Sequence, residues 1–181
     1  MNKKLKEIIS NLLYLLFVLL VTWLLLEFVV QRTDVEGSSM EPALSNGNVL
    51  FVDKISYRFS EPKRFDIIVF PYHQEVNKIF IKRIIGLPGE TVQIDGEGNI
   101  YINGEVLDED YGLETIAPHM VGIAAEPILL GEDEYFVMGD NRNDSKDSRM
   151  SVVGNIEKED IIGRAWLRIF PLSEFGFMRN K

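Results

Sequence analysis

The strongest constraint on this chain of 181 residues is one apolar segment near its N-terminus. Residues 8–30 contain a single charged residue, Glu27. As an α-helix the segment would be about 34 Å long, and the apolar core of a bilayer is about 30 Å thick. A cleaved secretory signal has a shorter apolar region followed by small residues, and residues 23–28 contain no Ala-x-Ala pattern. We therefore expect a retained transmembrane anchor.

The charges around this segment predict its orientation. Lys3, Lys4 and Lys6 precede it, and basic flanks usually stay in the cytoplasm. The pattern predicts a single-pass protein of the cell membrane, with a cytoplasmic tail at residues 1–7, an anchor at 8–30 and an extracytoplasmic domain at 31–181. Glu27 lies near the outer end of the anchor, where its carboxylate is expected to reach water.

Composition limits what the outer part can be. About 150 residues follow the anchor, which is enough for one domain with a sizeable core. The chain has no cysteine, which excludes disulfides, a thiol nucleophile and a cysteine-ligated zinc site. Its formal net charge of −9 at pH 7 argues against nucleic acid as a partner, because nucleic-acid binding relies on basic surfaces.

The outer part has the pattern of a mostly β fold. Runs rich in β-branched and aromatic residues recur between turn signals, at 49–53, 66–70, 79–85, 91–94, 99–102, 135–138 and 161–170. Asp95-Gly96-Glu97-Gly98 predicts a tight reversal and hence a hairpin over 91–102. Residues 105–133 are acidic and weakly periodic, so we expect a loop-rich insertion that either contacts substrate or serves as a connector. The apolar segment 170–178 is expected to pack in the core, with lipid contact as the alternative.

Ser39 is the first residue with a chemical implication. It lies in the turn Gly37-Ser38-Ser39-Met40-Glu41-Pro42, nine residues after the apolar segment, and nine residues extend to at most about 30 Å. Gly37 permits close backbone approach, and Pro42 fixes the exit of the turn. Such a turn can direct a hydroxyl group and backbone N–H groups at one carbonyl. It is also a common loop sequence, so a catalytic role requires a base that activates the serine.

Lys82 is the candidate base, because it lies in the apolar run 79–85. In a strand its side chain would point to the face opposite Ile81, where burial would favour the neutral amine. A general base needs a lysine pKa lowered from about 10.4 to about 7–8, which costs about 4 kcal/mol of desolvation. The alternative is a solvated lysine at a sheet edge. His73 and His119 occur in loop-like contexts and are expected to be surface or structural residues.

Residues 139–149 (GDNRNDSKDSR) form a third polar cluster. Short polar side chains suit a loop that bonds its own backbone and supports a neighbouring site. A calcium loop is the rival interpretation, but position six from Asn141 is Lys146 instead of glycine, and position twelve is Val152 instead of glutamate. We therefore favour a supporting loop.

Three motifs behind one anchor resemble bacterial type I signal peptidases: GSSMEPAL at 37–44, KRIIGLPGE at 82–90 and GDNRNDSKDSR at 139–149. The resemblance covers nearly the whole chain, and the short insertion before the third motif is similar to the compact Gram-positive members. It implies a mostly β catalytic domain of antiparallel sheets that needs no metal or cofactor. It also implies a serine endopeptidase that removes signal peptides from exported preproteins, after small residues at −1 and −3, through an acyl-enzyme.

By motif position, the resemblance implies that Ser39 is the nucleophile and Lys82 the general base. Ser145 would orient the lysine, and Asp147 and Arg149 would form a supporting ion pair. The small S1 and S3 pockets would be formed with the help of four apolar residues, Met40, Leu44, Phe80 and Ile81. Residues 79–82 would pair with the extended substrate by β-addition.

Two positions depart from the family pattern. Ala43 replaces the usual threonine, and Gly37 stands where some members place a serine whose hydroxyl lines the oxyanion hole. Backbone N–H groups, mainly that of Ser39, would then have to stabilise the oxyanion. The endoplasmic reticulum and archaeal branch shares the Ser-Met-Glu-Pro turn but has histidine where this chain has Lys82, so the resemblance is to the bacterial branch.

Two other functions remain to be weighed. Self-cleaving repressors of the SOS type use a Ser/Lys dyad on a β domain, but they need an N-terminal DNA-binding module where this chain has its apolar segment. The chain could also be an inactive, membrane-anchored β module that binds export partners. Loss of activity on removal of the Ser39 hydroxyl separates this module from an enzyme.

Overall fold

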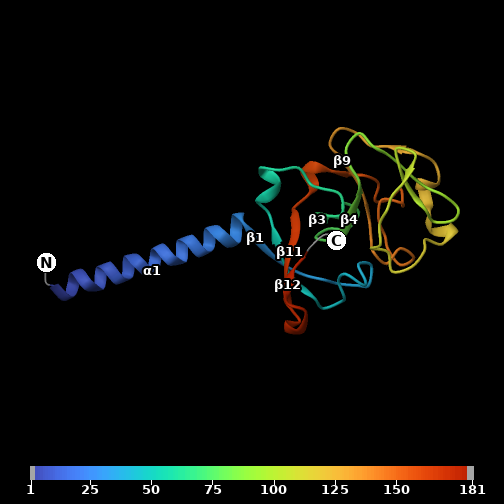
Figure 1. Cartoon of the computed structure of the whole chain (residues 1–181). Helices are drawn as coiled ribbons and strands as arrows, with labels where there is room; N and C mark the ends of the chain where they lie inside the picture. The colour runs from blue at the N-terminus through green and yellow to red at the C-terminus, as the bar shows by residue number, and fades with distance from the viewer. Residues whose placement is uncertain (1–2, 179–181) are drawn as a thin grey trace.

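A single long helix leads into a β domain. The computed structural model describes residues 3–178. Helix α1 (Lys3–Phe28) extends away from the domain as an isolated rod, and none of its residues is buried (Figure 1). Within the described residues it is the one helix long and apolar enough to cross a membrane. It ends at Phe28 because the chain turns into a strand at Val30, two residues before the predicted end of the anchor.

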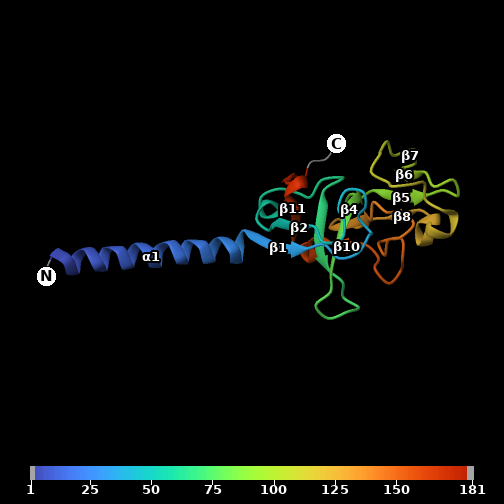
Figure 2. The same ribbon diagram turned by 90° about the horizontal axis from the view of Figure 1, so that it is seen from below.

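The domain is built of antiparallel sheets, as the resemblance implies, and the described residues form two of them. The larger sheet has the order β1-β2-β11-β3-β4-β9-β10, and β12 pairs with β11. Its strands are β1 (Val30–Asp34), β2 (Val49–Asp53), β3 (Ile67–Pro71), β4 (Ile79–Gly86), β9 (Glu134–Met138), β10 (Ile156–Glu157), β11 (Gly163–Phe170) and β12 (Gly176–Phe177). The smaller sheet, of order β7-β6-β5-β8, comprises β5 (Thr91–Ile94), β6 (Ile100–Ile102), β7 (Glu105–Val106) and β8 (Ile128–Leu129). Figure 2 shows the smaller sheet at the end of the domain farthest from α1.

Each of the seven predicted runs contains a strand, and the hairpin over 91–102 is confirmed as β5 and β6. Five strands were not predicted: β1, β7, β8, β10 and β12. Four of these are only two residues long, which is too short for an alternating pattern to be recognised. The fifth, β1, follows the apolar segment directly and has the mostly polar sequence VQRTD, so its pairing with β2 determines its conformation.

Hydrophobic residues cover both faces of the central strands. Along β3, Ile67 and Val69 belong to one core cluster, whereas Ile68 and Phe70 belong to another. This alternation is the two-residue period of a strand. From Ile81 to Gly86, β4 is buried at every position, so any side chain in this part of the strand is removed from water.

The segment 105–133 supplies two strands of the smaller sheet, β7 and β8, and packs against its core side. It contains the short helices η2 (Pro118–Met120) and η3 (Gly122–Ala125) between β7 and β8. Its buried side chains complete the core cluster that includes Val92 and Phe136; they are Ile116, Val121, Ala124 and Leu130. The segment is therefore loop-rich in conformation, but it contributes buried side chains to the core that it shares with the smaller sheet.

The expectation that segment 170–178 packs in the core is wrong for most of its apolar residues. Phe170, Leu172, Phe175 and Phe177 are each more than half exposed, and only Met178 packs against a core cluster. The short helix η5 (Leu172–Glu174) and strand β12 run along the edge of β11. The segment therefore extends the sheet and does not fold over it.

Candidate active site

The fold brings Ser39 and Lys82 together from distant parts of the chain. Ser39 lies in the turn after β1, and Lys82 lies in β4. Lys82 Nζ is 2.7 Å from Ser39 Oγ and donates a hydrogen bond to the Ile81 carbonyl at 2.9 Å. Met40 and Ile81, the chain neighbours of the two residues, are buried in the same core cluster. Packing of this cluster therefore holds the hydroxyl and the amine in contact.

Hydrogen bonds fix the turn that carries Ser39. Gly37 has a φ of +90°, which favours glycine, and its N–H donates to Asn46 Oδ1 at 2.9 Å. The Asn141 N–H donates to the Ser39 carbonyl at 3.1 Å. Ser38 Oγ donates to Asp144 Oδ2 at 2.6 Å. The turn is thus bound on one side to its own loop and on the other to the polar loop 139–149.

Lys82 is almost completely removed from water, with 4% of its surface exposed. Burial lowers the pKa of Lys82 from 10.5 to about 8, because the charged amine loses its hydration. The carboxylates of Asp147 and Asp140 raise this pKa, and the Arg149 guanidinium lowers it further. About a tenth of Lys82 is therefore neutral at pH 7, roughly 300 times the neutral share of a lysine with a pKa of 10.5. This excludes the solvated edge lysine that the sequence left open.

The loop 139–149 contains the expected ion pair. Arg149 donates two hydrogen bonds to the Asp147 carboxylate, both at 2.8 Å, and both side chains are buried. Asp147 Oδ2 also accepts from the Gly139 N–H at 3.0 Å, and Ser148 Oγ accepts from the Val137 N–H at 3.0 Å. The loop therefore bonds its own backbone and is joined to β9.

A second buried ion pair was not predicted. Arg83 donates to both oxygens of Asp140, at 2.8 and 2.6 Å, and its guanidinium lies 3.9 Å from the centroid of the Tyr111 ring. Beside it, Arg142 binds Glu109 at 2.6 Å. Glu109 and Tyr111 thereby link the segment 105–133 to the site. The signal in the sequence was the charge of Arg83 inside an apolar run, which requires a buried partner.

Ser145 is placed near Ser39 but does not bond to Lys82. Its side chain is buried, and its Oγ has no hydrogen-bond partner among residues 3–178. A Cβ on Gly139 would lie 2.3 Å from both Ser145 Oγ and the Ser39 carbonyl oxygen, so only glycine fits between them. The predicted role of Ser145 in orienting Lys82 stays a prediction.

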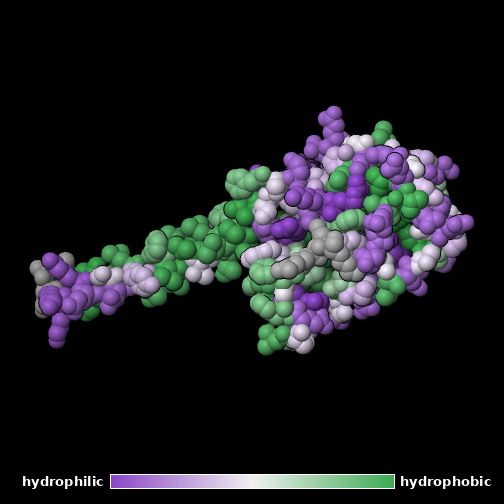
Figure 3. Space-filling model, in the orientation of Figure 1, coloured by the Kyte–Doolittle hydropathy of each residue, from purple (hydrophilic) through white to green (hydrophobic). Residues whose placement is uncertain are grey.

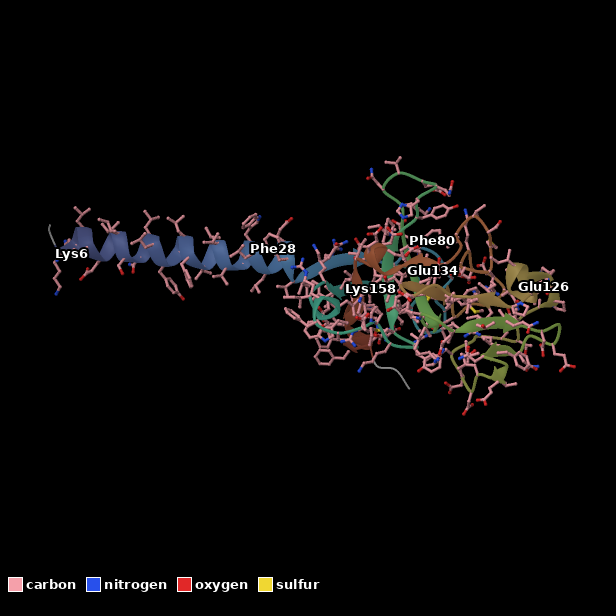
Figure 4. The ribbon with its side chains drawn as sticks, turned by 90° about the horizontal axis from the view of Figure 1, so that it is seen from above. Lys6, Phe28, Phe80, Glu126, Glu134 and Lys158 are labelled. Atoms are coloured by element: carbon pink, nitrogen blue, oxygen red, sulfur yellow. The ribbon has the colours of Figure 1, made fainter. Side chains whose placement is uncertain are left out.

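An open cleft of about 700 Å³ leads to the Ser39 hydroxyl. Residues 31–40 form one wall, residues 77–82 with Glu75 form the other, and Asp144 and Lys146 complete the lining. Strand β1 is an edge strand, and β4 pairs with β9 only from Arg83 onward, so both walls have unpaired backbone edges. Figure 4 shows Phe80 at the base of the loop that protrudes between β3 and β4.

Three of the four predicted substrate-binding residues, Met40, Phe80 and Ile81, line this cleft. Leu44 does not: it is fully buried in the core cluster that contains Met40. Neither histidine lines this cleft. His73 Nε2 contacts Asp160 Oδ2 at 3.0 Å, and His119 lines a cavity of about 70 Å³ together with Ser145 and Arg149. No cluster of three or more histidine or carboxylate side chains suited to a metal ion occurs among the described residues.

Comparison with known proteins gives consistent similarities. A family model described as signal peptidase, peptidase S26, matches residues 8–170. A signal peptidase I of Leptolyngbya laminosa is 40% identical over 156 residues, covering 82% of this chain and 73% of the relative. Signal peptidase I P of Bacillus subtilis subsp. natto is 36% identical over 177 residues, 94% of each chain. A crystal structure of a signal peptidase I from Enterococcus faecalis V583 has a TM-score of 0.48 at 36% identity, covering 58% of this chain and 97% of that one.

The burial of Lys82 predicts a pH-dependent stability. Below pH 8 the folded chain must bury the charged ammonium group of Lys82. Between pH 8 and 10.5 the folded chain gives up a proton that the unfolded chain keeps. The penalty, about 3 kcal/mol, is complete below pH 8 and disappears as the pH rises to about 10.5. We expect Lys82→Met to raise the free energy of unfolding by up to this amount at pH 7 and progressively less above pH 8, measured by denaturant unfolding in detergent.

The matched control is Lys63→Met, because Lys63 is exposed. It should leave the unfolding free energy unchanged across the same pH range. If Lys82→Met changes the unfolding free energy by the same amount at every pH, the pKa of Lys82 is the same in the folded and unfolded protein, and the burial argument is wrong.

Proposed function

The chain belongs to the peptidase S26 family of signal peptidases, as a type I serine peptidase that removes signal peptides, and from this premise we propose that Ser39 and Lys82 are its catalytic dyad. The observation that carries the proposal is the 2.7 Å contact between Lys82 Nζ and Ser39 Oγ. A neutral amine at this distance is within reach of the hydroxyl proton. Neither His73 nor His119 lines the cleft that leads to Ser39.

The proposed reaction proceeds through an acyl-enzyme. Lys82 takes the Ser39 proton while Ser39 Oγ bonds to the scissile carbonyl carbon. The tetrahedral adduct then expels the new amino terminus of the mature protein, which receives the proton from Lys82. A water molecule next gives a proton to Lys82 and its oxygen displaces Ser39 Oγ, which regains a proton. Lys82 thus serves as base and acid in both halves of the reaction.

We assign the stabilisation of the oxyanion to the backbone N–H of Ser39. In the described part of the chain this group has no hydrogen-bond acceptor, so it is available to a substrate oxygen. The Gly37 N–H donates to Asn46 and the Ser38 hydroxyl donates to Asp144. We therefore assign Gly37 a conformational role, through its positive φ, instead of a direct one.

The proposed substrate is an extended segment that adds to the free edges of β1 and β4. Backbone pairing with 79–82 would position the scissile bond, and small side chains at −1 and −3 would enter the lining formed by Met40, Phe80 and Ile81. Leu44 would shape this lining only from behind, because it is buried.

For the membrane we propose the arrangement predicted from the charges: residues 1–7 in the cytoplasm, of which 1 and 2 lie outside the described part, the anchor at 8–30, and the catalytic domain at 31–181 outside. The exposed apolar side chains of Phe59, Leu172 and Phe175 support an additional contact of the domain with lipid. Figure 3 shows hydrophobic surface on the side of the domain nearest α1.

The alternative of an inactive β module is disfavoured by the cost of burying Lys82. A binding module gains nothing from an amine held next to a serine in its core, whereas substitution by an apolar residue would relieve the desolvation. The SOS-type repressor is disfavoured because the exposed apolar helix α1 takes the place of a DNA-binding module.

The first prediction concerns the dyad. Ser39→Ala and Lys82→Ala should each abolish processing of a preprotein bearing Ala-x-Ala, because one lacks the nucleophile and the other its base. The logarithm of kcat/KM for wild-type protein should rise with pH to a plateau above about 8, since only neutral Lys82 accepts the proton. Both are measured with purified protein in detergent.

The matched controls are His73→Ala and His119→Ala, which should retain wild-type processing. Retained cleavage in Lys82→Ala at neutral pH, or loss of cleavage in a histidine variant, would contradict the dyad. An unaltered cellular role for Ser39→Ala would favour the inactive module.

The second prediction concerns orientation. Since the chain has no cysteine, single cysteines can report on each side of the membrane. Glu97→Cys, in an exposed turn, should react with a membrane-impermeant maleimide in intact cells, whereas Lys4→Cys should react only after permeabilisation. The reverse labelling pattern would refute the proposed topology.

A further inference from the structure

Asn141 contacts the peptide groups on both sides of Ser39, and the dyad mechanism gives it no role. The residue is 8% exposed. Its Nδ2 donates a hydrogen bond to the Ser38 carbonyl at 3.3 Å, and its backbone N–H donates to the Ser39 carbonyl at 3.1 Å. One buried residue therefore holds both of the peptide planes that flank the proposed nucleophile.

The bond from the Asn141 side chain sets the direction of the Ser39 N–H. A peptide group is planar, and in its trans form the N–H points opposite to the C=O. Because the Ser38 carbonyl is directed at Asn141, the Ser39 N–H points away from Asn141. Ser38 and Ser39 line the cleft, whereas Asn141 does not. The N–H that is assigned to the oxyanion is thereby kept on the side of the turn opposite to this buried residue, where it is free for a substrate oxygen.

The other bonds of Ser38 do not replace the one from Asn141. The Glu41 N–H donates to the same carbonyl at 3.0 Å, but Glu41 belongs to the same turn, so this bond moves with the turn. The Ser38 hydroxyl donates to Asp144, but a side chain can rotate about its own bonds without turning the peptide. Asn141 instead follows β9 and ties the peptide itself to the sheet.

The position of Asn141 is coupled to that of Lys82. Its chain neighbour Asp140 accepts two hydrogen bonds from Arg83, and Arg83 follows Lys82 in β4. Both members of this ion pair are buried. The ion pair therefore fixes Asn141, and through it the peptide of Ser39, relative to the strand that carries the proposed base.

We propose that Asn141 is a positioning residue of the oxyanion site, whose side-chain amide orients the peptide between Ser38 and Ser39 so that the Ser39 N–H meets the oxyanion. The inference rests on the proposed function, because it requires Ser39 as the nucleophile. A donor directed at the oxyanion lowers the barrier without strengthening the binding of the substrate. Loss of the Asn141 amide should therefore lower kcat and leave KM unchanged.

The test compares Asn141→Ala and Asn141→Leu with the wild-type protein, in detergent, on a preprotein bearing Ala-x-Ala. Both variants lose the amide but keep the backbone bond to the Ser39 carbonyl, and leucine also keeps most of the side-chain volume. Removal of a whole oxyanion donor costs about 100-fold to 1,000-fold in kcat. Because the Ser39 N–H is misdirected and not removed, we expect kcat to fall about tenfold to 100-fold.

A matched pair of inhibitors separates the oxyanion from ordinary binding. With a signal-peptide aldehyde, Ser39 Oγ bonds to the carbonyl carbon and the carbonyl oxygen becomes the oxyanion, while Lys82 holds the proton. The corresponding primary alcohol has no carbonyl and reports on binding alone. The Asn141 variants should bind the aldehyde more weakly by the factor lost in kcat and bind the alcohol as the wild type does. The pH midpoint of kcat/KM should stay near 8, because Lys82 is not disturbed.

The matched control is Asn143→Ala, in the same loop. The Asn143 side chain accepts from the Ala117 N–H at 2.8 Å and donates to the Thr115 carbonyl at 3.0 Å, so it bonds to a different segment. This variant should keep the wild-type kcat and the wild-type affinity for the aldehyde.

Three results would overturn the role of Asn141. They are an unchanged kcat in both Asn141 variants, a loss of affinity for the alcohol as large as that for the aldehyde, and an equal loss of kcat in Asn143→Ala. A wild-type protein that does not cleave the preprotein, or a Ser39→Ala variant that does, would instead refute the proposed function itself.

Discussion

The burial of the Lys82 amine next to the Ser39 hydroxyl is the constraint on which the site depends. Two carboxylates, those of Asp140 and Asp147, influence this amine. Asp140 is already bound by two guanidinium nitrogens of Arg83, and Asp147 by two of Arg149. A carboxylate that is paired with an arginine in this way stabilises a second cation less. With 4% exposure and hydrogen bonds only to a hydroxyl and a carbonyl, the charged form of Lys82 is poorly stabilised, and its pKa falls to about 8. The two arginines thus limit how far the carboxylates raise the pKa of Lys82.

The architecture explains why such a lysine occurs. Strand β4 is covered on both faces from Ile81 onward, yet its first half has an edge that β9 leaves unpaired. The same strand therefore provides a dry environment for an amine and an open backbone for a substrate. Because β1 connects the anchor directly to the Ser39 turn, the site is kept within a short distance of the membrane, where an emerging signal peptide would be found.

Much of this could be predicted from the sequence. The strands were predicted from β-branched runs bounded by turns. The contact between Ser39 and Lys82 was expected from a lysine in an apolar run combined with a serine turn. What could not be predicted depends on tertiary contacts. The Arg83–Asp140 pair joins residues 57 positions apart, and the bond between Ser38 and Asp144 spans 106 positions. Likewise, the motif position of Leu44 suggested a pocket residue but does not reveal how deeply its side chain is buried. The apolar composition of segment 170–178 suggested a core segment, because composition does not reveal that β12 extends the sheet.

The most direct test of the account is the ionisation of Lys82 itself. NMR of protein labelled with ¹³C at the lysine ε carbons, with the Lys82 resonance identified by its loss in Lys82→Met, would follow the amine from pH 6 to pH 11. The account predicts a midpoint near 8 for this resonance, with the exposed lysines titrating above pH 10. A Lys82 midpoint above 10 would leave less than about one thousandth of the amine neutral at pH 7, and Lys82 could not then be the base that activates Ser39.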